Sequence, residues 1–97
     1  CDQGDDAQGV VVVWRSCAPN NMKQSSADIA GKTEAITLIS GKLLAGEHDD
    51  LRCLDIGKTH TFAADVPHRY QTDDSWATLM MVITYAKQEY AKQELQP

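Results

Sequence analysis

Three side chains, Glu34, His60 and His68, have the residue types to hold a ligand together. A carboxylate and two imidazoles suit iron, manganese, nickel or zinc, and a catalytic metal needs at least three protein ligands. The same groups could instead orient a small organic molecule in an apolar pocket. As a third alternative, Glu34 and His68 could simply satisfy each other as buried polar groups.

These side chains lie on segments that are predicted to be β-strands, at residues 33–39, 59–62 and 67–71. Side chains along a strand point alternately to opposite faces, so every second residue shares a face. By this rule Glu34, Ile36 and Leu38 share one face of the first strand, and His60 and Phe62 share one face of the second.

The rest of the chain reads as short strands separated by turns, which predicts an all-β barrel or sandwich. The β-branched run 10–14 is predicted to be a buried strand, and 76–85 a central one. Ser40 and Gly41 are predicted to form a tight hairpin turn. Further strands are expected at 22–29, 42–45 and 51–56, and Trp14 and Trp76 are expected in the core.

Size and charge limit the functions that this chain can have. Its 97 residues are enough for one domain with a modest core. A net charge of −5 with scattered Lys and Arg argues against direct contact with nucleic acid. No apolar run is long enough to span a bilayer, so no membrane partner is expected. Three widely spaced cysteines fit reduced thiols in a cytoplasmic protein, although a Cys17–Cys53 bridge stays open.

The two ends of the chain differ in composition from its middle. Residues 1–9 are acidic and are predicted to form a flexible stub before a β-domain at 10–85. Residues 86–97 belong to a repeated Tyr-Ala-Lys-Gln-Glu sequence of helix formers, which predicts a helical tail. Because the chain begins at Cys1, a lipid-anchored binding domain is an alternative to a truncated chain.

Two sequence patterns carry a family resemblance over residues 33–85. Glu34 precedes Gly41 by seven positions, and Gly57 precedes His68 across a turn and a proline. This arrangement resembles the two motifs of the cupin superfamily, which implies a small double-stranded β-helix, or jelly-roll barrel. The paired histidines that the family carries before Glu34 are replaced here by Asp28, Ile29 and Ala30.

Residues 62–70, which read Phe-Ala-Ala-Asp-Val-Pro-His-Arg-Tyr, resemble a narrower group. They are similar to the C-terminal sensor domain of bacterial helix-turn-helix regulators that carry a cupin. The resemblance implies a non-catalytic homodimer that senses a small molecule, with a metal-dependent isomerase or dioxygenase as the alternative. No cofactor is expected, and a divalent metal, if bound, would use Glu34, His60 and His68. The expected pocket residues are Glu34, Ile36, Leu38, His60, Phe62, His68, Tyr70 and Met81.

Overall fold

The structure, a computed structural model, describes residues 9–86. Within this range all regular structure is β, and no helix is present that could cross a membrane. The predicted helical tail falls mostly at residues 87–97 and so lies outside the described part. The eight strands are β1 (Gly9–Cys17), β2 (Met22–Ser25), β3 (Thr33–Ser40), β4 (Leu43–Glu47), β5 (Asp50–Leu54), β6 (Thr59–Ala63), β7 (His68–Gln71) and β8 (Ala77–Tyr85).

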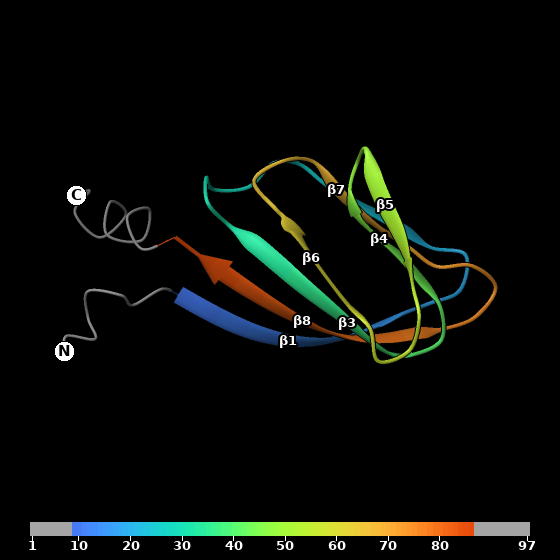
Figure 1. The fold of residues 1–97 in the computed structure, drawn as a ribbon. Coiled ribbons are helices and arrows are strands. Elements are labelled where there is room, and N and C mark those ends of the chain that lie inside the picture. The colour runs from blue at the N-terminus through green and yellow to red at the C-terminus, as the bar shows by residue number, and fades with distance from the viewer. Residues whose placement is uncertain (1–8, 87–97) are drawn as a thin grey trace.

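The strands form two antiparallel sheets of four strands each. One sheet has the order β1-β8-β3-β6 and the other β2-β7-β4-β5, so sequence neighbours are mostly in different sheets. Figure 1 shows the two sheets as layers that face each other, with β1, β8 and β3 side by side in one of them. The predicted central strand is confirmed, because β8 lies between β1 and β3.

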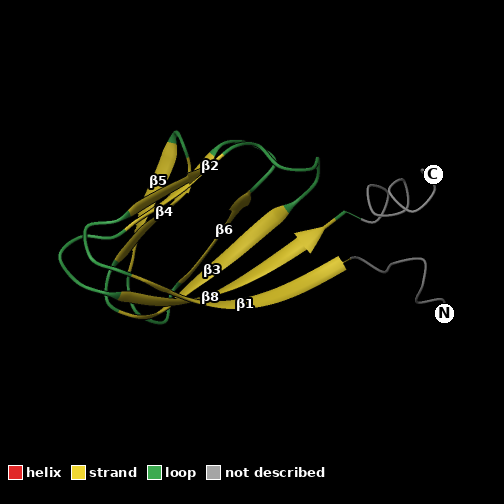
Figure 2. Ribbon diagram, turned by 180° about the vertical axis from the view of Figure 1, so that it is seen from behind, coloured by secondary structure: helices red, strands yellow, loops and turns green. Residues whose placement is uncertain are grey.

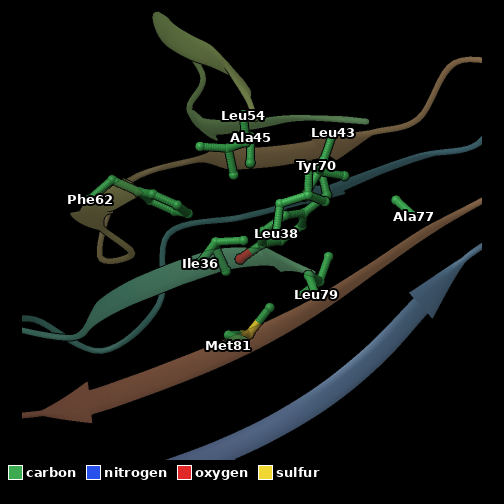
Figure 3. Packing of buried hydrophobic residues seen from close by; sticks show 10 residues of the cluster. All are labelled: Ile36, Leu38, Leu43, Ala45, Leu54, Phe62, Tyr70, Ala77, Leu79 and Met81. Atoms are coloured by element: carbon green, nitrogen blue, oxygen red, sulfur yellow. The ribbon is translucent and has the colours of Figure 1, made fainter. Parts of the chain in front are cut away.

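The core fills the space between the sheets. Alternate residues of β3 and β8 point inward, and Ile36, Leu38, Leu43 and Leu79 are fully buried. Figure 3 shows inward side chains of β3 and β8 directed toward Leu43 and Tyr70 of the opposite sheet. Period-two alternation therefore predicted the buried face of β3 correctly.

The prediction that residues 10–14 form a buried strand is wrong on burial. They lie in β1, which is at the edge of its sheet and pairs only with β8 among the described residues. Val10 and Val12 are each 56% exposed, and Trp14 is 63% exposed. Nothing in residues 9–86 covers the outer face of this strand, and within the run only Val13, which is partly buried, packs against the core.

The predicted hairpin at Ser40 and Gly41 is also wrong. Gly41 connects β3 to β4, and these strands belong to different sheets, so the turn carries the chain from one layer to the other. Two further corrections concern exposed residues: Trp76 is 61% exposed rather than buried, and Ile56 lies in a turn after β5, also exposed. Figure 2, the view from behind, shows loops that connect the two layers at the end of the molecule away from the labels N and C.

Candidate functional site

Glu34 and His68 face each other across the gap between the two sheets. Glu34 is on β3 and His68 begins β7, and their side chains are 5% and 2% exposed. The Nε2 atom of His68 lies 3.6 Å from Oε2 of Glu34. That separation is too long for a hydrogen bond, so the two groups are neighbours that are not bonded to each other.

Lys32 is the cation beside this pair. It is two positions before Glu34, so the strand periodicity directs both side chains to the same inward face. Its Nζ atom donates a hydrogen bond to Asp28 and lies 3.7 Å from Oε2 of Glu34. The same ammonium is 5.6 Å from the ring centre of Tyr85, within the range of a cation–π contact.

The protonation of these groups follows from burial and pairing. Burial raises the pKa of Glu34 above its ordinary value of 4.5, although the positive charges of a protonated His68 and of Lys32 oppose the change. The hydrogen bond from Lys32 lowers the pKa of Asp28. Burial by itself would lower the pKa of Lys32, but the hydrogen bond and charge of Asp28 outweigh it and raise that pKa.

A hydrogen bond to the backbone fixes the orientation of the His68 ring. Its Nδ1 atom lies 2.8 Å from the carbonyl oxygen of Val66, so the Nδ1–H group donates to the backbone. In the neutral ring this tautomer leaves a lone pair on Nε2, which faces Glu34. The rings of Phe62 and Tyr70 pack around the imidazole at centre distances of 5.9 and 6.1 Å.

Two polar atoms at this site are buried without a hydrogen-bond partner among the described residues. They are Oε1 of Glu34 and the hydroxyl oxygen of Tyr70. A buried polar group without a partner costs on the order of 1–3 kcal/mol, so most native structures pair it. These atoms therefore mark where a bound molecule or water would gain hydrogen bonds.

A cavity of about 350 Å³ adjoins these atoms. Its size is at the lower end of the range for small-molecule pockets, roughly 300–1,000 Å³. Strand β8 supplies the apolar side chains Leu79, Met81 and Ile83, and most of the other lining side chains are polar. The lining consists of Arg15, Ser16, Cys17, Asn21, Lys23, Ser25, Asp28, Lys32, Glu34, His68, Tyr70, Gln71, Thr72, Leu79, Met81 and Ile83.

Four of the eight expected pocket residues line this cavity, and the other four do not. Glu34, His68, Tyr70 and Met81 are at the cavity wall. The remaining expected residues, Ile36, Leu38, Phe62 and His60, are absent from its lining, and the first three belong to the hydrophobic core.

His60 is placed apart from the cavity, beside β4. Its ring is 5.3 Å from that of Phe62, and a Cβ added to Gly46 would lie 3.0 Å from its Nε2 atom. That nitrogen is buried and has no hydrogen-bond partner among residues 9–86. His60 lies beside Phe62 as the alternation predicts, but this face of β6 is directed toward β4 and not toward the cavity.

The described residues do not fit a metal centre built from Glu34, His60 and His68. Within residues 9–86, no three His, Cys, Asp or Glu side chains are close enough to hold one ion. The Lys32 ammonium lies near the carboxylate oxygen that a metal would use, where two positive charges would repel each other. Lys32 thus provides the positive charge at this carboxylate.

Sequence reasoning missed Lys32 and Asp28 as site residues. Asp28 enters the sequence prediction only as a replacement for a histidine of the family, and Lys32 does not enter it. Side-chain alternation could have identified Lys32, since positions 32, 34, 36 and 38 have the same parity and are all buried. Arg15 and Lys23 had no comparable signal, because their place at the cavity mouth depends on how the two sheets meet.

Comparison with known proteins identifies the fold. No family model matches the sequence, and no curated protein matches it. Solved structures do match. The cupin_2 domain of an XRE-family transcriptional regulator from Enterobacter cloacae superposes with a TM-score of 0.70 at 25% identity, covering 79% of this chain and 81% of that one.

Two other solved structures are similar to this chain. An HTH_3 family transcriptional regulator from Vibrio cholerae has a TM-score of 0.77 at 20% identity and covers 86% of this chain. This chain spans 46% of that regulator. A sugar phosphate isomerase from a cupin superfamily, from Silicibacter pomeroyi, has a TM-score of 0.61 at 19% identity, covering 82% of this chain and 52% of that one. The predicted all-β, cupin-type barrel is therefore confirmed.

Proposed function

We propose that this chain, which has the fold of the cupin superfamily, is a small-molecule-sensing domain of a bacterial transcriptional regulator. The observation that carries the proposal is the cavity of about 350 Å³, whose wall contains buried polar atoms without partners. A pocket with apolar walls and a few convergent polar groups is the usual form of a small-molecule site. The similarity to two regulators supports the regulatory context, which is cytoplasmic because the DNA is there.

The bonding of Lys32 and His68 supports binding without catalysis. Lys32 is held by Asp28 and by the neighbouring Glu34, so its ammonium is protonated and is not a nucleophile. His68 uses Nδ1 to bond the backbone and keeps Nε2 for a ligand. These groups can position a molecule and discriminate its polar atoms.

The site lies between the two sheets, which is where a ligand could change their arrangement. Glu34 belongs to one sheet and His68 to the other, so a ligand that contacts both would connect the two layers. A ligand changes a conformational equilibrium only to the extent that it binds one state better. A bridging ligand would favour the arrangement of the sheets that brings Glu34 and His68 to contact distance, and the rest of a regulator would respond to that arrangement.

Removing the imidazole of His68 is the direct test of the binding site. We expect a panel of small carboxylic acids, amines, polyols and aromatic molecules to contain members that raise the thermal midpoint of the wild-type protein. His68→Ala should weaken those binders by at least about tenfold, since it removes a buried acceptor from the site. Isothermal titration calorimetry on both proteins measures the change.

His48→Ala is the matched control, because His48 is an exposed histidine in the turn between β4 and β5. It should bind the same panel members as the wild type. If no panel member binds the wild-type protein, or if His68→Ala and His48→Ala bind equally well, the proposed site is wrong.

A further inference from the structure

We propose that the cavity selects molecules with two features, a hydrogen-bond-donating head and an anionic tail. The head is a hydroxyl or a protonated amine bound between Glu34 and His68, and the tail is a carboxylate or phosphate near Arg15 and Lys23. This inference rests on the proposed binding function and names the chemical class of its ligand.

On the floor of the cavity, Glu34 and His68 present acceptors to which a donor can bond, and the Tyr70 hydroxyl beside them can donate or accept. Oε1 of Glu34 has no hydrogen-bond partner among the described residues, and Nε2 of neutral His68 has a free lone pair. The 3.6 Å between the imidazole and carboxylate leaves them unbonded to each other. A single O–H or N–H group placed between them could donate to either, and an ammonium could donate to both.

The charge of the floor permits either kind of head. With His68 neutral, the ionised side chains Asp28 and Glu34 and the single ammonium of Lys32 leave one net negative charge. An ammonium would neutralise that charge. A hydroxyl would need no compensation, and it is the better head for a Glu34 carboxyl that keeps its proton.

The mouth of the cavity is cationic. Arg15 on β1 and Lys23 on β2 line it from opposite sheets, and both are exposed. Within residues 9–86 neither has a carboxylate within 4.0 Å, whereas the Asp28 carboxylate is bonded to Lys32. Cations on two sides of an opening attract an anion and hold it at the rim. A ligand that fills the cavity therefore meets acceptors inside and positive charge outside.

Four matched four-carbon probes test the two features separately. They are 4-hydroxybutyrate, 4-aminobutyrate, butyrate and 1-butanol, used up to about 10 mM, a concentration that detects dissociation constants near 1 mM. We expect the hydroxy or the amino acid to bind at least about tenfold more tightly than butyrate, which lacks the donor, and than 1-butanol, which lacks the anion. The stronger of the first two identifies the head.

Two variants test which residues bind the donor head and which bind the anionic tail of the ligand. Glu34→Met, which leaves no strong acceptor at this position, should remove the preference over butyrate, and the exposed pair Arg15→Ala/Lys23→Ala should remove the preference over 1-butanol. Butyrate or 1-butanol binding as tightly as both bifunctional acids would overturn the inference, as would failure of both acids to bind. Binding of any panel molecule lacking these groups, if it is lost in His68→Ala, would leave the proposed function standing and refute only the ligand class.

Discussion

Gly41→Ala is expected to remove most of the stability of this domain. Gly41 has a φ of +84°, and a Cβ at this position would lie 2.0 Å from the carbonyl oxygen of Trp76 and 2.9 Å from Cα of Ala77. These are backbone atoms at the start of the central strand β8, so they cannot give way as a flexible side chain can. We expect a loss of about 4 kcal/mol or more, out of a total of roughly 5–15 kcal/mol for a domain.

Gly57→Ala is the control for the backbone conformation alone. Gly57 has nearly the same φ of +87°, but an added Cβ would meet nothing within 4 Å. The conformational cost of about 1–2 kcal/mol should therefore be its whole effect. Urea unfolding followed by circular dichroism measures both. If the two variants lose equal stability, the close approach of Gly41 to β8 does not govern the crossing between the sheets.

Lys32→Met is expected to destabilise the protein strongly at neutral pH and much less in acid. The variant leaves Glu34, whose side chain is 5% exposed, without its nearby ammonium. Removing one partner of a buried ion pair typically costs about 3–5 kcal/mol, and the 3.7 Å separation here makes the lower end of that range appropriate. The measurement is the free energy of unfolding of the wild type and of Lys32→Met at several values between about pH 4 and pH 8.

The direction of the pH dependence follows from Glu34. Its pKa in the folded protein is raised above 4.5, so between 4.5 and that raised value the folded state binds more protons than the unfolded state. Stability therefore falls as pH rises through this interval. Loss of Lys32 raises the pKa of Glu34 further and extends the fall to higher pH. The bond from Lys32 to Asp28 acts in the opposite direction, because the pKa of Asp28 is lowered from 3.8. Its contribution is constant from about pH 4 to pH 8 and is lost only in stronger acid.

The double variant Lys32→Met/Glu34→Gln separates this cause from lost packing. Glutamine carries no charge, so the double variant should recover the part of the loss that depends on pH. A loss that is constant across the pH range, and that Glu34→Gln does not relieve, would mean that Lys32 acts through its bond to Asp28 or through the packing of its methylene chain, and not through Glu34.

The cavity and the core were predictable to different degrees. Alternation along β3 identified Glu34, Ile36 and Leu38 as inward, and all three are buried. Which inward residues face the cavity was not predictable in the same way. His60 and His68 are both inward, but β6 ends the sheet that contains β3, whereas β7 lies between β2 and β4 in the other. Only His68 therefore reaches Glu34 from the opposite layer.

The sequence by itself determined the class of fold and which side chains of β3 share the buried face. Short-range alternation and turn residues record these properties, and they depend only on neighbouring positions. Tertiary structure decided that β1 is exposed, that Gly41 joins two sheets, and that Lys32 with Asp28 provides the positive charge beside Glu34 and His68. Each of these depends on which strands become neighbours, and that pairing is set by contacts between residues far apart in the chain.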